Sequence, residues 1–270
     1  MNIGRFAEAI CSRLRDAQIP NQWSEGHEGT PTRYATVDML LPDDEAHRIY
    51  EAFQQGRDHF SVRNSFRERK QTSSQFDLLP PLLRDVTFAF QTPEVVSLLS
   101  ELLNIDDLSG DPTLYAGGLS KMGKGDFLNP HIDNSHEATR DRYRRVNLLY
   151  YVTPDWNLED GGNLELWDPH VRKPVTIYSA FNRLVLMETN RGSWHSVSRV
   201  TTSKASRCCV SNYYFSEISP NGGDYYHVTS FTGRPGQLGR RLVAHFDNRA
   251  RDLARKFGAS RASDKGYQGN

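Results

Sequence analysis

The stretch RRVNLLYYVTPDWNLEDGGNLELWD, residues 144–168, contains two β-rich runs separated by turn-forming residues. The runs at 146–153 and 161–168 are rich in Leu, Val, Tyr and Trp, and Pro, Asp, Asn and Gly occupy the interval between them. Strand-like runs of the same kind continue on both sides, at 114–122, 175–179, 183–189, 196–200 and 207–216. Short strands at this density, broken by turn residues, predict a barrel or a double-sheet sandwich.

The remaining sequence predicts helices around this β core. Ile3, Phe6, Ile10 and Leu14 recur at helical spacing and predict a helix over 2–17. The chain is therefore expected to be α+β, mainly β, and to form a single domain over residues 1–270. Its expected parts are a mixed helical support at 1–110, a β core at 111–217, a loop and closing helix at 218–257, and a tail at 258–270. Within the support, we expect a strand at 34–41 and helices near 44–55, 80–91 and 93–104.

Composition excludes several classes of protein. Lys and Arg number 33 and Asp and Glu number 33, so the formal net charge is zero. A nucleic-acid or membrane-surface binder usually has a basic excess, so neither partner is expected. No apolar run approaches the roughly 18 residues of a membrane span, and no secretory signal is recognised at the N-terminus. Cys11, Cys208 and Cys209 form no CxxC pair, which indicates a reduced, cytoplasmic protein.

One short motif carries chemistry. His131 and Asp133 are separated by one residue, so in an extended segment their side chains point the same way and can meet one ion. A lone HxD is common by chance, and its ordinary alternative is a surface His beside an Asx turn. His195, 64 residues later, supplies a second imidazole in a strand-like region. Two imidazoles and one carboxylate describe the facial triad of non-haem Fe(II) oxygenases, whereas catalytic zinc, the competing metal, usually has a tetrahedral site.

Four blocks in this order resemble the Fe(II)/2-oxoglutarate-dependent dioxygenases, specifically the prolyl-4-hydroxylase-like branch. They are GDFLNPHIDNS, the stretch 144–168, FNRLVLMETNRGSWHSV and SRCCVSNYYF, within a region running from Leu114 to Glu217. The resemblance implies a double-stranded β-helix, or jelly-roll, core. It also implies that His131, Asp133 and His195 bind Fe(II), with 2-oxoglutarate and O₂ as co-substrates and ascorbate as reductant.

The resemblance further implies that Arg207 and Tyr151 bind the distal carboxylate of 2-oxoglutarate. A guanidinium suits this role because it donates two parallel hydrogen bonds to a carboxylate. Two alternatives remain open, Lys204 for the cation and Tyr150 for the hydroxyl. Lys204 competes because the interval from His195 to Arg207 is twelve residues, longer than is usual in the branch.

Substrate residues are the least determined part of the prediction. Strand alternation places Arg145, Asn147, Leu149 and Tyr151 on one face, so Arg145 and Asn147 are candidate substrate contacts. The cationic stretch from Arg63 to Lys70 is a second candidate for contact with an anionic group.

The expected reaction is hydroxylation of an unactivated C–H bond, with release of succinate and CO₂. A carboxylate at Asp133 favours this outcome, because related halogenases have Gly or Ala at that position. We expect a small-molecule substrate such as an amino acid, sugar or natural product. The alternative is a prolyl hydroxylase acting on a peptide or protein. A non-catalytic cupin-like metal-binding or sensing protein is a third possibility, but it would lack the Arg207 and Tyr151 anchor. The sequence predicts no oligomeric state.

Overall fold

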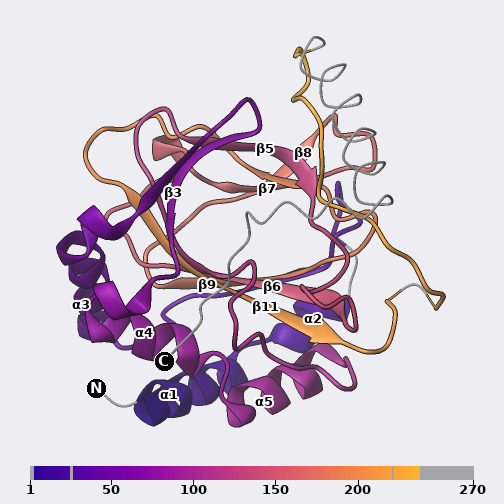
Figure 1. Cartoon of the computed structure of the whole chain (residues 1–270), viewed down its shortest axis with the longest axis horizontal. Coiled ribbons are helices and arrows are strands. Elements are labelled where there is room, and N and C mark those ends of the chain that lie inside the picture. The colour runs from indigo at the N-terminus through magenta and orange to yellow at the C-terminus, as the bar shows by residue number, and fades with distance from the viewer. Residues whose placement is uncertain (1–2, 25–26, 221, 238–270) are drawn as a thin grey trace.

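The computed structural model describes residues 3–24, 27–220 and 222–237. Its described strands form one curled antiparallel sheet, in the order β1-β9-β6-β11-β4-β3-β5-β10-β7-β8, with β2 paired to β3 and β12 to β5. In Figure 1 the β9-β6-β11 part faces the layer that contains β5, β7 and β8. The bounds are β1 Tyr34–Val37, β2 Ser61–Asn64, β3 Glu68–Ser73, β4 Gly118–Met122, β5 Phe127–Ile132, β6 Tyr143–Tyr151, β7 Leu164–Trp167, β8 Pro174–Ile177, β9 Arg183–Glu188, β10 His195–Val197, β11 Arg207–Ser216 and β12 Ser230–Phe231. This curled sheet agrees with the jelly-roll core expected from the sequence.

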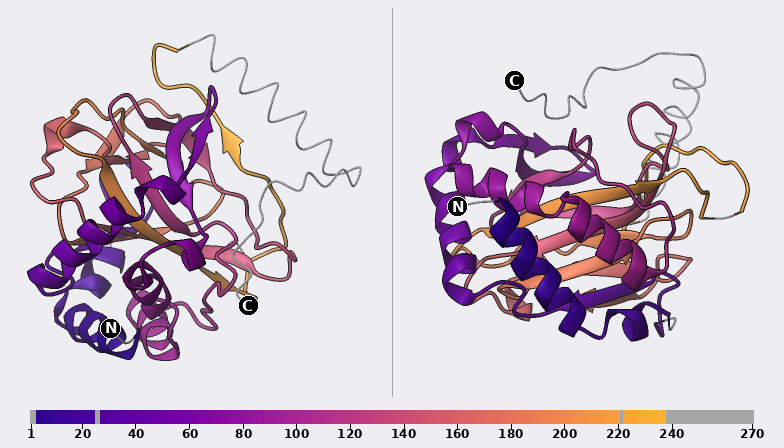
Figure 2. Two further views of the ribbon diagram at one scale, coloured as in Figure 1. Left: turned by 60° about the vertical axis from the view of Figure 1, so that its left-hand side comes forward. Right: turned by 90° about the horizontal axis from the view of Figure 1, so that it is seen from below.

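Helices from the N-terminal third cover the outer face of the β9-β6-β11 layer (Figure 2). They form because their apolar residues recur at helical spacing, as at Phe6, Ile10 and Leu14 of the first helix, all of which are buried. Pro93 begins the last of the described α-helices at a position where its missing N–H costs nothing. The α-helices are α1 Ile3–Asp16, α2 Ile19–Ser24, α3 Asp43–Gln55, α4 Pro81–Ala89 and α5 Pro93–Leu103. None of the described helices is long and apolar enough to cross a membrane.

Alternation along the central strands separates two cores. Leu148 and Tyr150 of β6 pack toward the helices in the large outer cluster, whereas Tyr151 packs inside the sheet with Leu166 and Met187. Neighbouring cysteines divide in the same way, since Cys208 belongs to the outer cluster and Cys209 to the inner one. The inner face of β6 therefore lines the interior of the jelly roll.

A β-bulge interrupts this alternation near the start of β6. Val146 pairs with Tyr214 of β11, but the next residue of β11, Phe215, pairs with Arg144, so Arg145 is an extra residue with no partner there. The bulge turns Arg144 into the interior. Arg145 instead donates hydrogen bonds to Ser216 Oγ and the Ile218 carbonyl. The prediction that Arg145 shares the inner face with Asn147 was wrong, because simple alternation does not anticipate a bulge.

The charged stretch at 57–78, whose sequence predicts no particular element, contains the β2–β3 hairpin. β3 pairs with both β4 and β5 and so joins the two layers of the sheet. Residues 238–270, which include the expected closing helix and the tail, lie outside the described residues. The division into a single domain stays a prediction.

Truncating Leu186 tests the outer core. This residue of β9 is fully buried and pairs with Leu148 on one side and Ala35 on the other. Leu186→Ala is expected to lower the free energy of unfolding by about 2–5 kcal/mol, because it removes buried methyl groups and leaves a cavity. Val62, 69% exposed, is the control, and Val62→Ala is expected to change stability by less than about 0.5 kcal/mol. Urea unfolding measures the stability of both variants, and an equal loss of stability in the two would contradict the burial of Leu186.

Candidate metal centre

Strand pairing brings together the two histidines predicted as ligands. His131 of β5 pairs directly with His195, the first residue of β10, and Asp133 follows β5 immediately. One ligand atom from each of the three residues lies within 4.8 Å of the others. His131 Nε2 is 3.5 Å from Asp133 Oδ1, and His195 Nε2 is 3.6 Å from Asp133 Oδ2. The three side chains thus converge on one point inside the sheet.

Backbone carbonyls fix the orientation of both imidazoles. His131 Nδ1 lies 3.0 Å from the Asn129 carbonyl oxygen, and His195 Nδ1 lies 2.9 Å from the Ser193 carbonyl oxygen. A carbonyl only accepts hydrogen bonds, so in each ring Nδ1 carries the proton and the Nε2 lone pair faces Asp133. This arrangement is the usual way in which proteins prepare a histidine to bind a metal.

Burial and charge favour the metal-binding forms of two of these side chains. Burial lowers the pKa of His195 to about 4, and the neighbouring His131 acts in the same direction. Burial by itself would raise the pKa of Asp133, but His195, His131 and Arg144 hold that pKa well below its ordinary value. At neutral pH His195 is therefore neutral and Asp133 is charged. A neutral imidazole and a carboxylate together suit a divalent cation.

The low pKa of His195 predicts how stability without metal depends on pH. In the unfolded chain the residue takes up a proton near pH 6.5, whereas in the folded chain it does so only near pH 4. The unfolded state binds more protons between these values, so this contribution is fully present above about pH 6.5 and is lost as the pH falls toward 4. Its size is on the order of 3 kcal/mol. Urea unfolding in EDTA should therefore show a weaker pH dependence across this window for His195→Gln than for the wild type. An identical pH dependence in the variant and the wild type would contradict the low pKa of His195.

Arg144, which sequence reasoning missed, contacts the carboxylate of this centre. Its Nη1 is 3.4 Å from Asp133 Oδ2, and its guanidinium stacks over the Tyr213 ring at 4.1 Å. The side chain is only 2% exposed, yet its Nε and Nη2 make no hydrogen bond to the described residues. Asn147 Nδ2 donates to the Tyr213 hydroxyl at 3.2 Å, and Asn147 Oδ1 has no such partner. Arg144 and Asn147 thus offer unused donors and an acceptor beside the metal centre.

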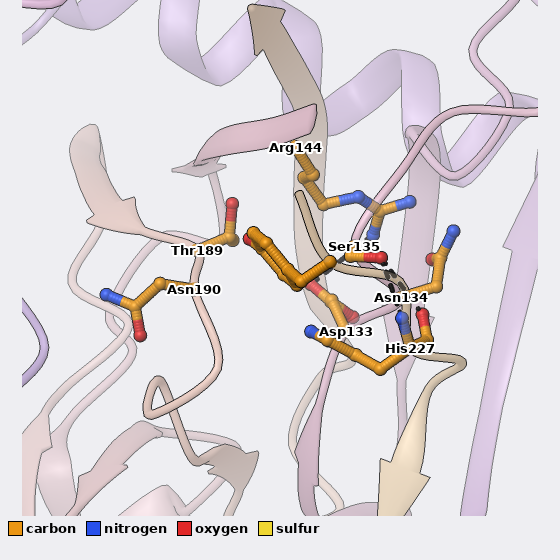
Figure 3. A pocket seen from close by; sticks show the side chains of 8 residues that line it. Asp133, Asn134, Ser135, Arg144, Thr189, Asn190 and His227 are labelled. Carbon is orange, nitrogen blue, oxygen red and sulfur yellow. Dashed lines mark hydrogen bonds and ion pairs between the residues drawn. The ribbon is translucent and has the colours of Figure 1, made fainter. Parts of the chain in front are cut away.

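A narrow polar pocket lies next to Asp133, with Arg144 at the top of Figure 3 and Asn134 and His227 lower down. Several of its buried polar atoms have no hydrogen-bond partner among the described residues: Asp133 Oδ2, Thr189 Oγ1, Tyr225 OH, His227 Nε2 and the two Arg144 nitrogens. Buried polar groups are normally paired, so such a concentration indicates a place where a ligand or solvent completes the contacts.

A larger cavity of about 500 Å³ contains both the metal centre and the predicted 2-oxoglutarate anchor. Arg207, the first residue of β11, is 4% exposed, and its guanidinium lies 5.1 Å from the centroid of the Tyr151 ring. Its Nη2 contacts only the weak acceptor Met122 Sδ, at 3.1 Å, and Arg207 forms no ion pair with the described residues. A buried cation without a counter-ion is costly, so the site suits an anionic ligand.

The hydroxyl and glycine beside Arg207 fit the same ligand. Burial raises the pKa of Tyr151 to about 12, so its hydroxyl remains a donor at neutral pH, and it too has no hydrogen-bond partner within the described chain. A Cβ at Gly162 would lie 3.1 Å from Arg207 Cδ, so glycine leaves room for that side chain.

Lys204 and Tyr150, the two alternative residues for the 2-oxoglutarate anchor, lie outside the cavity. Lys204 Nζ pairs with Asp160 at 2.6 Å, and the residue does not line the cavity. The Tyr150 hydroxyl donates to Asn182 Oδ1 on the helix side of the sheet.

Residues 117–215 match the family model described as the 2OG-Fe(II) oxygenase superfamily. A curated relative, the prolyl 3-hydroxylase OGFOD1 of Mus musculus, is 31% identical over 77 residues. That alignment covers 27% of this chain and 14% of the relative, so the chain spans only a small part of the longer protein.

Solved structures share the fold at lower identity. A prolyl 4-hydroxylase from Phytophthora capsici aligns with a TM-score of 0.55 and 20% identity, covering 91% of this chain and 74% of that chain. A prolyl hydroxylase from Trichoplax adhaerens, solved with a hypoxia inducible factor peptide fragment, aligns with a TM-score of 0.50 and 22% identity. That alignment covers 76% of this chain and 91% of that chain. These likenesses support the jelly-roll architecture.

Proposed function

We propose, from the match of residues 117–215 to the 2OG-Fe(II) oxygenase superfamily, that the chain is a prolyl hydroxylase acting on a peptide or protein. The observation that carries the proposal is the buried convergence of His131, Asp133 and His195 in the same cavity as Arg207. A cupin-like protein without turnover would not need the unpaired Arg207 and Tyr151 beside its metal.

His131, Asp133 and His195 would hold Fe(II) through two Nε2 atoms and one carboxylate. Arg207 would bind the distal carboxylate of 2-oxoglutarate with its guanidinium, and the Tyr151 hydroxyl would donate to the same group. Iron and 2-oxoglutarate, when bound, supply the oxidation that inserts one oxygen atom of O₂ into a C–H bond, with succinate and CO₂ as co-products. The chain's part is to orient the co-substrate, position the target carbon and exclude water.

The peptide substrate is better supported than the small molecule expected from the sequence. The curated relative is named a prolyl 3-hydroxylase. The unused Arg144 nitrogens can donate to a carbonyl of a polypeptide, and Asn147 Oδ1 can accept from an N–H. An extended peptide segment offers both kinds of group. Asp133 supplies a carboxylate ligand, which favours hydroxylation over halogenation.

The test is turnover by the purified chain with Fe(II), 2-oxoglutarate and ascorbate. Pools of proline-containing peptides are compared with the same peptides carrying Ala for Pro, and with pools of free amino acids and sugars. Succinate and a mass gain of one oxygen are measured together. Oxygen transfer confined to proline peptides supports the proposal, whereas coupled turnover with a small-molecule pool overturns it.

Arg144 provides a more specific prediction. Arg144→Gln is expected to raise the KM for a peptide substrate about tenfold, because one charge-assisted hydrogen bond to a carbonyl is lost. Arg145→Gln is the matched control, since Arg145 lies outside the cavity lining, and it is expected to change KM less than about twofold. Mn(II) titration of both variants checks that the metal site remains. Equal KM values for the two variants would remove Arg144 from substrate binding.

A further inference from the structure

The β2–β3 hairpin brings an excess of positive charge to the mouth of the metal cavity. Arg63, Arg67 and Lys70 line the same cavity as the metal centre, and the register places Arg63 opposite Lys70. Glu68 is the hairpin's carboxylate in this lining, and its Oε2 is already 2.9 Å from Lys70 Nζ. Arg63 makes no ion pair with any described residue; its Nε donates to Thr72 Oγ1. The whole chain has no net charge, so this excess is local.

The tip of the hairpin is fixed to the strand that carries a metal-centre histidine. Asn129 of β5 donates its backbone N–H to the Arg67 carbonyl at 2.9 Å and its side-chain Nδ2 to the Phe66 carbonyl at 2.8 Å. The Asn129 carbonyl in turn accepts the hydrogen bond from His131 Nδ1. Ser65 Oγ closes the turn by accepting from the N–H groups of Arg67 and Glu68. The hairpin cations therefore have a defined position relative to the metal centre.

The Phe231 ring lies between the Arg67 guanidinium and the His131 ring and limits the distance between them. The Arg67 guanidinium lies 5.6 Å from the Phe231 ring centroid, and that ring stacks on His131 at 5.2 Å with an interplanar angle of 16°. The two contacts in series place the guanidinium within about 11 Å of the His131 ring. An extended polypeptide covers about 3.4 Å per residue, so this upper limit corresponds to about three residues.

We propose that this hairpin binds an acidic side chain of the substrate, an Asp or Glu two to four residues from the hydroxylated proline. The proposal rests on the proposed function and names its substrate class: proline in an acidic sequence context. Arg63 and Arg67 supply the attraction, and the fixed hairpin tip sets the spacing. Charge complementarity of this kind selects among substrates that fit the inner site equally well.

The experiment uses a set of peptides with one proline and a single Asp placed one to six residues away on either side. Each peptide is compared with its Asn counterpart, which has the same shape without the charge. Fluorescence anisotropy measures binding under anaerobic conditions, and mass spectrometry measures hydroxylation. We expect binding about tenfold tighter for Asp than for Asn at two to four residues on one side of the proline, and less than about twofold at the other positions. High salt should remove the difference.

The variants Arg63→Gln, Arg67→Gln and their combination are expected to bring the Asp-to-Asn ratio to about one. Arg69→Gln is the matched control: Arg69 lies on the same hairpin, but it pairs with Asp126 at 3.0 Å and does not line the cavity. It should leave the ratio unchanged. Circular dichroism checks that each variant is folded.

The outcomes separate the two levels of the proposal. Hydroxylation of Asp and Asn peptides with equal affinity and rate overturns the acidic preference and leaves prolyl hydroxylation standing. An Asp preference in binding that depends on Arg63 and Arg67, without hydroxylation of any peptide, overturns the prolyl hydroxylase and leaves the hairpin site. An oligonucleotide that displaces the labelled Asp peptide as effectively as an unlabelled Asp peptide does would assign the surface to phosphates and overturn the proposal.

Discussion

Asp133→Asn is expected to lower metal-dependent succinate formation by a factor on the order of 10³. The substitution preserves shape but removes the negative charge that faces His131, His195 and Arg144 in a buried site. Without that charge, a divalent cation entering the site would meet two imidazoles and the Arg144 guanidinium, which repels it. Metal affinity, measured by Mn(II) titration, should fall together with turnover.

Asp126→Asn is the control for the loss of a buried carboxylate as such. Asp126 is 5% exposed, accepts a hydrogen bond from the Gly123 N–H and pairs with Arg69, but it does not line the cavity. Its substitution should reduce stability and leave metal affinity within about twofold of the wild type. Normal Mn(II) binding by Asp133→Asn would show that the three converging side chains are not the metal ligands.

Arg207→Gln is expected to raise the KM for 2-oxoglutarate by about 30- to 100-fold. Each hydrogen bond from a buried guanidinium to a carboxylate contributes about 1.5–3 kcal/mol, and glutamine replaces the charged donor with a neutral one. The KM of Arg207→Lys for 2-oxoglutarate should lie between those of the wild type and Arg207→Gln, because lysine keeps the charge but cannot donate two parallel hydrogen bonds. The kcat at saturating 2-oxoglutarate should change much less than KM.

Lys204→Gln distinguishes this anchor from the alternative that the sequence leaves open. Lys204 is held by Asp160 and the Asp155 carbonyl outside the cavity, so its loss should change the KM for 2-oxoglutarate less than about twofold. A large effect at Lys204 with none at Arg207 would reverse the assignment.

The sequence predicts the proximity of His131 and Asp133 because their spacing is local. The i, i+2 spacing of His131 and Asp133 places both side chains on one side of an extended segment, and the structure confirms that they meet. The pairing of His131 with His195 depends on strand register, which spacing alone does not define. The choice between Arg207 and Lys204 depends on burial, which strand propensity only suggests.

Arg144 and the hairpin show where sequence reasoning fails. A single extra residue at Arg145 exchanges the faces of two adjacent arginines, and nothing in the alternation of RRVN marks it. The residues of β3, Glu68–Ser73, are mostly polar, and strand propensity therefore gives no signal there. Their strand conformation comes from pairing with β4 and β5, which are distant in the sequence.

The position of β3 also has a mechanical consequence. His131 and His195 belong to β5 and β10, whereas Tyr151 and Arg207 belong to β6 and β11, and β4 and β3 connect these two groups in the sheet order. The separation between the proposed iron and the anchor of its co-substrate is therefore set across two short strands, and β3 is the more exposed of them. A substrate that binds the β2–β3 hairpin would therefore contact the part of the sheet that joins the metal-binding strands to the strands of the co-substrate anchor.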